Sequence, residues 1–310
     1  MLCLLEHLNF KVPLATGERV IQDFFVKKLG CPECPSGRMR VSPPVKGPVK
    51  EGVAKQMHVN LGLSQIHFEW CTGDGREFAQ PQRLEGTVTI AVKDLNLLEK
   101  RLGEGKKIGY YYKNDHGRET KLVVMDPFGM TTWICEQATA EFQKNLAQFG
   151  QVRPGGVGEV LGILRIDYNC QIGVSASIAK FYEEMFQIPV TKHANGHAIR
   201  TKFGQIISFN ETMTGPPPDA YEVNPAAWGI HMCFYIEDFK ENSNKLQRLF
   251  WVNPDYKIPP INDNVSTVEE ALERKQFRIK HLGERFVFEH EIRAINHPLS
   301  PIKQILHARL

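Results

Sequence analysis

The sequence predicts an α+β protein assembled from four βαβββ units. Three observations lead to this fold class: a short alternating hexamer recurs four times along the 310 residues, a helical pattern follows each copy, and strand-like runs broken by turn residues follow each helix. Each unit therefore opens with a strand, continues with a helix and ends with further strands.

The hexamers mark the first strand of each unit. They begin at positions 7, 87, 167 and 231, with spacings of 80, 80 and 64 residues, and read "HLNFKV", "TVTIAV", "DYNCQI" and "HMCFYI". Self-similarity at a nearly fixed period indicates one supersecondary unit used repeatedly.

Amphipathic periodicity predicts the helix of each unit. In the third copy the apolar residues recur at i, i+3, i+4, i+7 and i+8: Ile178, Phe181, Tyr182, Met185 and Phe186. The first two copies show shorter versions of this pattern: Ile21, Phe24, Phe25 and Leu29, then Leu95, Leu98 and Leu102. Asp94 and Asp238 each lie seven residues after a hexamer begins, where an aspartate can cap the helix that follows.

Turn-delimited apolar runs predict the remaining strands. The second copy ends in "KLVVMDPFGMTTWICE", in which "DPFG" predicts a tight turn between two strands. The first copy contains "CPSGRMRVSPPVKGPVKEG", an insert rich in Pro and Lys that we expect to spoil or displace one strand. The fourth copy contains a second helix near residues 265–275, which the capping-box pattern Ser266-x-x-Glu269 predicts.

The stretch "FGQVRPGGVGEVLG" predicts the boundary between two modules of two units each. We expect an N-terminal module at 1–148, an exposed linker at 149–160 and a C-terminal module at 161–310.

Composition limits the classes of partner. Lys and Arg number 38 against 35 Asp and Glu, without blocks of like charge, so neither nucleic acid nor a membrane is an expected partner, and a small-molecule substrate is. The seven cysteines are scattered through apolar segments, which favours free thiols in a reducing compartment and hence the cytoplasm. Cys31 and Cys34 have the spacing of half a zinc site, but a second pair of suitable spacing is missing from the sequence.

This arrangement resembles the vicinal oxygen chelate superfamily, which includes glyoxalase I, bleomycin-resistance proteins, extradiol dioxygenases and hydroxyphenylpyruvate dioxygenase. The resemblance covers roughly residues 3–140 and 160–295, and "HMCFYIED", "VSASIAKFYEEMF" and "VVMDPFGMTTW" carry it most specifically. It implies units paired into cupped sheets, each module holding a divalent metal (Fe, Mn, Zn or Ni) on its concave face. The ligands would come from the first and last strands of its two units.

In the N-terminal module the implied ligand positions fall on His7, His67, Thr87 and Trp133. Two imidazoles without a carboxylate form a thin set for a catalytic metal. We expect His7 and His67 to face each other across the concavity, with Trp133 filling the space of a metal.

In the C-terminal module the implied positions fall on Asp167, Ser208, His231 and, in the last strand, Glu289 or Glu291. Asp167, His231 and one glutamate would make a site with one histidine and two carboxylates. Such a set departs from the two-histidine, one-carboxylate triad of iron dioxygenases but suits a hard divalent ion.

Two classes of function remain open. The first is a metal-dependent enzyme, dioxygenase-like or of the glyoxalase-like lyase or isomerase type, acting on a small oxygen-rich substrate. The second is a metal-free binding or interaction protein, which Thr87, Trp133 and Ser208 at ligand positions would favour.

Overall fold

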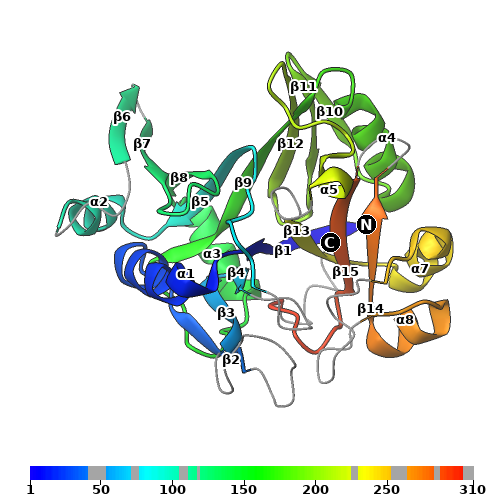
Figure 1. Ribbon diagram of the computed structural model, residues 1–310, viewed down its shortest axis with the longest axis horizontal. Helices are drawn as coiled ribbons and strands as arrows, with labels where there is room; N and C mark the ends of the chain where they lie inside the picture. Colours follow the sequence, from blue (N-terminus) through cyan, green and yellow to red (C-terminus); the bar gives the residue numbers. More distant parts are fainter. Residues whose placement is uncertain are drawn as a thin grey trace.

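The structure is a computed structural model that describes residues 1–40, 54–70, 77–104, 111–116, 119–224, 230–252, 264–282 and 287–302 (Figure 1). Four strand–helix–strand units follow one another along the chain. The first two units contain β1 (Leu2–Lys11), α1 (Leu14–Val20), η1 (Ile21–Lys28), β2 (Glu33–Arg40), β3 (Ala54–Leu61), β4 (Ser64–Glu69), β5 (Gly86–Val92), α2 (Leu95–Gly103), β6 (Tyr111–His116), β7 (Glu119–Met125) and β8 (Thr132–Gln137). After α3 (Ala140–Phe149), the last two contain β9 (Val160–Gln171), α4 (Ser175–Phe186), β10 (Val190–His193), β11 (Gly196–Arg200), β12 (Ile206–Thr212), α5 (Ala220–Val223), β13 (His231–Ile236), α7 (Phe239–Leu246), η2 (Gln247–Leu249), α8 (Val268–Arg274), β14 (Gln276–His281) and β15 (Val287–Ala294).

The structure confirms the predicted α+β class. The first three units have the predicted βαβββ topology, whereas the fourth has one strand fewer in the described residues, with β13, β14 and β15. In every unit the last strand lies parallel beside the first: β4 beside β1, β8 beside β5, β12 beside β9 and β15 beside β13. The helix crosses between them, as a parallel connection requires.

The pairing of units differs from the predicted one. β1 pairs antiparallel with β13, and β5 pairs antiparallel with β9, so the first unit shares a sheet with the fourth and the second with the third. The seven-stranded sheet has the order β14-β15-β13-β1-β4-β3-β2, and the eight-stranded sheet has the order β10-β11-β12-β9-β5-β8-β7-β6. The division into an N-terminal and a C-terminal sheet is therefore wrong. The Gly/Pro-rich segment after α3 therefore joins two units of the same sheet. The first strands of the four units have similar free edges, so the repeat pattern alone did not determine which of them pair.

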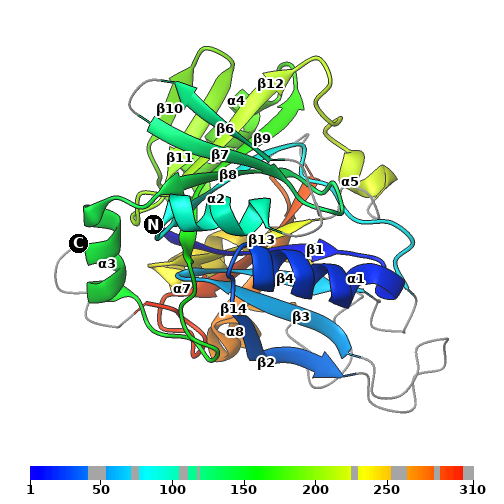
Figure 2. The ribbon, with the colours of Figure 1, turned by 90° about the vertical axis from the view of Figure 1, so that its left-hand side faces the viewer.

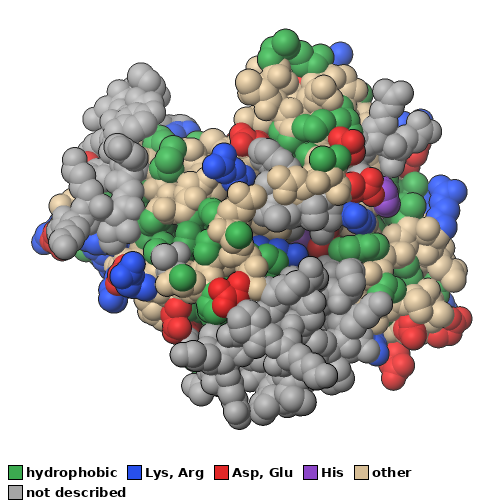
Figure 3. All heavy atoms as spheres, in the orientation of Figure 1, with side chains coloured by type: hydrophobic (Ala, Val, Ile, Leu, Met, Phe, Trp, Pro, Cys, Tyr) green, Lys and Arg blue, Asp and Glu red, His purple; other side chains and the backbone are tan. Residues whose placement is uncertain are grey.

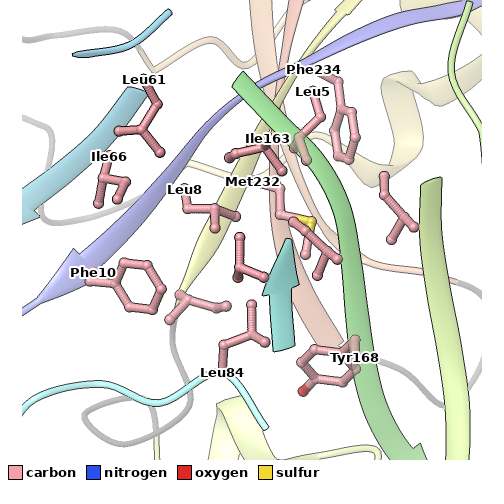
Figure 4. Close-up of a cluster of buried hydrophobic side chains, with 14 of the residues drawn as sticks. Leu5, Leu8, Phe10, Leu61, Ile66, Leu84, Ile163, Tyr168, Met232 and Phe234 are labelled. Atoms are coloured by element: carbon pink, nitrogen blue, oxygen red, sulfur yellow. The ribbon is translucent and has the colours of Figure 1, made fainter. Parts of the chain in front are cut away.

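The core lies between the two sheets and includes the helices, as the turned view shows (Figure 2). Apolar side chains of one parity on β1, β4 and β13 meet those of β9 from the other sheet (Figure 4): Leu8, Phe10, Ile66, Met232, Phe234, Ile163 and Tyr168. Phe25 of η1 contacts both Phe68 of β4 and Trp133 of β8, at ring-centroid distances of 4.9 and 5.7 Å. On β1 beyond the register shift at Leu5/His7, and on β4 and β13, alternate side chains such as His7, His67 and His231 consequently face away from this core.

The helix caps and the turn predicted from the sequence were confirmed in part. Asp94 caps α2 by accepting from the Leu97 amide, as predicted, whereas Asp238 makes no side-chain cap and has a φ of 51°. The capping box of α8 is formed by Thr267 and Glu270, one residue beyond the predicted pair. Asp126 accepts hydrogen bonds from the Phe128, Met130 and Thr131 amides, which closes the predicted "DPFG" turn.

The surface matches the mixed composition. On the face shown in Figure 3, basic and acidic side chains are interspersed with apolar ones. Among the described residues, the helices are too short or too polar to cross a bilayer. Of the Pro/Lys-rich insert, residues 41–52 lie outside the described residues. Cys31 and Cys34 are buried free thiols, and burial raises the pKa of Cys31.

Gly62 provides a test of how closely the sheets approach. It has a φ of +59°, and a Cβ there would lie 1.9 Å from the Leu161 carbonyl oxygen of β9, whereas Gly173 has a φ of +84° and open space around its Cβ position. We expect Gly173→Ala to lower the free energy of unfolding by about 1–2 kcal/mol through backbone strain alone. Gly62→Ala should cost at least about 2 kcal/mol more because the clash adds to the strain. Urea denaturation checks both, and equal losses would contradict the close approach.

Candidate metal centre

The outward face of the seven-stranded sheet carries two rows of polar side chains that run across its strands. Strand register aligns the first row from β14 to β4: Arg278, Glu291, Cys233, His7 and Gln65. One step along the strands, register aligns the second row from β15 to β3: Glu289, His231, Asn9, His67 and His58. Side chains two apart on a strand share a face, so these residues lie on one face of the sheet, which corresponds to the concave face expected from the sequence.

Three donors from these rows converge on one point. The Nε2 atoms of His7 and His231 are 3.3 Å apart, and each lies 3.7 Å from Oε2 of Glu291. A point equidistant from these three atoms lies about 2.1 Å from each, within the range of about 2.0–2.2 Å for bonds of Zn²⁺ to nitrogen and oxygen. All three side chains are buried.

The electrostatics keep the donors in ligand form. Burial lowers the pKa of His231 well below its ordinary value, and the nearby charge of Arg278 adds to this effect, so the imidazole is neutral. Burial alone would raise the pKa of Glu291, but Arg278 and Arg293 outweigh it and hold the pKa well below its usual range. A neutral imidazole and an ionised carboxylate are the forms that bind a metal.

Two arginines support the carboxylates of β15. Arg278 reaches Glu289 at 2.5 Å and Glu291 at 2.8 Å, and Arg293 reaches Glu291 at 2.5 Å. Glu289 lies 3.7 Å from Nδ1 of His231 and so flanks the ring on the side away from the three donors. Of the two glutamates proposed for this strand, Glu291 is therefore the one that points to the centre.

His67 lies beside the centre without joining it. Its ring stacks on His7 at a centroid distance of 3.8 Å and on His58 at 3.4 Å, and its Nε2 hydrogen-bonds Oε1 of Gln65 at 3.0 Å. Burial lowers the pKa of His67 well below its ordinary value, and the neighbouring His58 and His7 reinforce the shift. His7 and His67 thus share one face of the sheet and stack on each other.

The other predicted positions lie elsewhere. Trp133 is in the second sheet, where its ring is buried in the core and its Nε1 donates to Asp126, so the prediction that it fills the space beside His7 is wrong. Thr87, Asp167 and Ser208 also belong to the second sheet. Asp167 pairs with Arg165 through two contacts of 2.6 Å and does not converge with His231 and Glu289, which corrects the proposed ligand set.

The donor set fits a divalent metal. Two imidazole nitrogens and one carboxylate oxygen form a facial triad typical of non-haem iron(II), and Mn, Zn and Ni accept the same donors. Oε1 of Glu291 is buried and accepts no hydrogen bond from the described residues, although Arg293 lies close to it. A second cluster, of Glu6, His7 and Cys233, has donors within 4.8 Å of one another, but burial raises the pKa of Cys233 well above its ordinary value, so its thiol stays protonated.

Comparison with known proteins bears on the fold. No family model and no curated protein sequence matches the chain. A crystal structure of a Bacillus subtilis protein described as a "putative dioxygenase" superposes with a TM-score of 0.54 at 14% identity, covering 94% of this chain and 86% of that one. Glyoxalase I from Zea mays gives 0.52 at 11% identity, covering 94% and 92%. The likeness shows that this chain shares the fold of these two proteins.

Within this fold, sequence reasoning missed several residues around the centre. Glu6, His58, Arg153, Arg278 and Arg293 were not singled out. A signal existed for the two arginines of unit four, because "QFRIKH" and "FEHEIRA" alternate polar and apolar residues on paired strands. Arg153 carried no such signal, since it lies outside the units.

The histidine stack gives a testable pH dependence. Burial lowers the pKa of His58 to about 3, so below the ordinary pKa of 6.5 the unfolded chain binds a proton that the folded protein does not. Stability should fall as pH decreases through this window, by about 1.4 kcal/mol per pH unit for each such histidine.

His58→Phe keeps a ring on His67 and removes one titrating group. Urea unfolding of metal-free protein between about pH 6 and 4 should show a slope shallower by about 1.4 kcal/mol per pH unit. An unchanged slope would mean that His58 is charged in the folded protein.

Proposed function

We propose that the protein is a metal-dependent enzyme that binds one divalent ion through His7, His231 and Glu291 and acts on a small oxygen-rich substrate. One observation carries the proposal: donors from the first strand of unit one and from the first and last strands of unit four surround a single point at bonding distance. Three protein ligands leave positions open for a substrate, as catalytic rather than structural metal sites do.

The triad favours dioxygenase-like chemistry over the glyoxalase-like alternative. The sequence alone suggested one histidine and two carboxylates, whereas His7 replaces Asp167 and gives two histidines and one carboxylate. This is the set that non-haem iron oxygenases use, with facial positions left open. The likeness in fold to glyoxalase I and to the Bacillus subtilis protein is compatible with either reaction.

A bound divalent ion would supply Lewis-acid stabilisation of negative charge on substrate oxygens. The protein groups prepare the site for such an ion in three ways. His231 is held neutral by burial, so its nitrogen can bind the ion without first losing a proton. Arg278 bridges Glu289 and Glu291 and fixes their orientation. The burial of these side chains keeps bulk water from the donors, which strengthens electrostatic interactions.

A second candidate follows from the same arginines. Arg278 and Arg293 together with Arg153 match the buried charges of Glu6, Glu289 and Glu291, so this cluster is neutral without a metal. A metal-free binding protein with this cupped sheet would therefore need no ion to balance these charges. Metal content separates the two functions.

The test is metal stoichiometry in protein purified without chelator and in single variants. Wild type should hold one divalent ion per chain. His231→Ala should lose it while retaining the fold, because the side chain lies on the polar face of the sheet rather than in the apolar core. His67→Ala should retain the ion, since its Nε2 is engaged by Gln65.

Asp167→Ala is the matched control, because it removes a carboxylate at an equivalent strand position of the other sheet. It should leave metal content unchanged. Loss of metal in Asp167→Ala, or full occupancy in His231→Ala, would contradict the assigned triad. Metal-free wild type that also fails to bind added Fe²⁺, Mn²⁺, Zn²⁺ or Ni²⁺ would favour the metal-free binding protein.

A further inference from the structure

Glu6 occupies the concave face because β1 is irregular at this point. Leu5 pairs with Phe234 and His7 pairs with Cys233, so two residues of β1 advance while β13 advances by one. Such a bulge re-aims side chains that regular alternation would separate. Glu6 and His7 consequently share a face, and Oε2 of Glu6 lies 2.5 Å from Nδ1 of His7.

Glu6 is also held from two other directions. Nη1 of Arg153 lies 2.5 Å from Oε1, and Nη1 of Arg293 lies 3.8 Å from Oε2. With two guanidinium groups beside its oxygens, the Glu6 carboxylate is placed to accept a hydrogen bond from Nδ1 of His7.

Arg153 belongs to the segment between α3 and β9, which was expected to be an exposed linker. Most residues of 151–159 are exposed or partly so, but the Arg153 side chain is only 10% exposed and its Nη2 donates to the Leu63 carbonyl oxygen. The side-chain amide of Asn60 donates from Nδ2 to the Pro154 carbonyl oxygen and holds the same segment against the sheet. A connection between units two and three thus reaches a site built by units one and four.

The contact with Glu6 determines the tautomer of His7. When a carboxylate accepts the Nδ1 proton of a neutral imidazole, Nε2 is left with its lone pair, and in His7 this atom faces His231 and Glu291. Carboxylates placed behind metal-binding histidines commonly fix ring orientation and raise ligand basicity. A carboxylate that served only to balance Arg153 and Arg293 would not need the bulge that brings it to Nδ1.

We propose that Glu6 is the positioning residue for His7, holding its Nε2 ready for the metal, and that Arg153 anchors Glu6 for this purpose. The inference rests on the proposed metal-binding function. It adds that the segment 151–159 is a functional part of the site.

Two measurements on Glu6→Gln test the proposal. Long-range ¹H–¹⁵N NMR of metal-free protein, at a pH of about 9 so that imidazoles are neutral, should show His7 protonated at Nδ1 in wild type and at Nε2, or as a mixture, in Glu6→Gln. Titration with Co²⁺, followed by its visible absorption bands, should show affinity reduced about 10- to 100-fold. Circular dichroism establishes that the variant is folded.

Arg153→Met removes the side chain that anchors Glu6 and leaves Glu6 and His7 themselves unchanged. It should reduce the affinity for Co²⁺, but by a smaller factor than Glu6→Gln does. Asp167→Asn is the control, because it neutralises an ion-paired carboxylate on the other sheet, and should change neither readout. An unchanged tautomer and an unchanged Co²⁺ affinity in Glu6→Gln would overturn the role of Glu6 and leave the metal site intact. Wild type that binds no Co²⁺ would overturn the proposed function as well as the positioning role.

Discussion

The antiparallel pairing of β1 with β13 is the contact on which the rest of the structure depends. It joins the first unit to the fourth, and its register sets His7 opposite Cys233 and Asn9 opposite His231. Because β4 and β15 lie parallel on the outer edges of these two strands, the same pairing brings the ends of both units to one concave face. Residues more than 200 positions apart in sequence then become neighbours, and β5 and β9 form the second sheet in the same way.

This pairing also sorts the ligand positions of the repeat. The four positions in the seven-stranded sheet carry His7, His67, His231 and Glu291, whereas those in the eight-stranded sheet carry Thr87, Trp133, Asp167 and Ser208. One sheet therefore carries the side chains that could bind a metal, and the other has residues that serve packing and ion pairs, such as Trp133 in the core and Asp167 with Arg165.

The carboxylates on this face would be costly to bury without ion-pair partners. Glu6, Glu289 and Glu291 are each at most 2% exposed, and burying a carboxylate without a partner costs several kcal/mol. Arg153, Arg278 and Arg293 offset this cost by pairing with them, so the charges hold one another in place. A hydrophobic face would be simpler to stabilise. The ionisable groups kept on this face are those that the proposed metal site would need.

The sequence predicted most of what is local and little of what is distant. Alternation within the hexamers placed His7 and His231 on first strands, and periodicity placed Phe181 and Tyr182 on the buried face of α4, because both depend only on neighbours in the chain. Which first strands pair was not predictable, since all four have similar free edges, and the proposed ligand Asp167 was wrong for that reason. Glu6 was not predicted because a bulge in β1 breaks the alternation of side chains. Arg153 was not predicted because the composition of its segment is typical of a linker.

The most direct measurement of the central claim is anomalous diffraction from crystals grown with Zn²⁺, recorded at the zinc absorption edge. If units one and four build the site, the strongest peak will lie between Nε2 of His7, Nε2 of His231 and a carboxylate oxygen of Glu291, at about 2.0–2.2 Å from each. A strongest peak beside Asp167 in the other sheet, or an empty position between these three donors, would contradict the account.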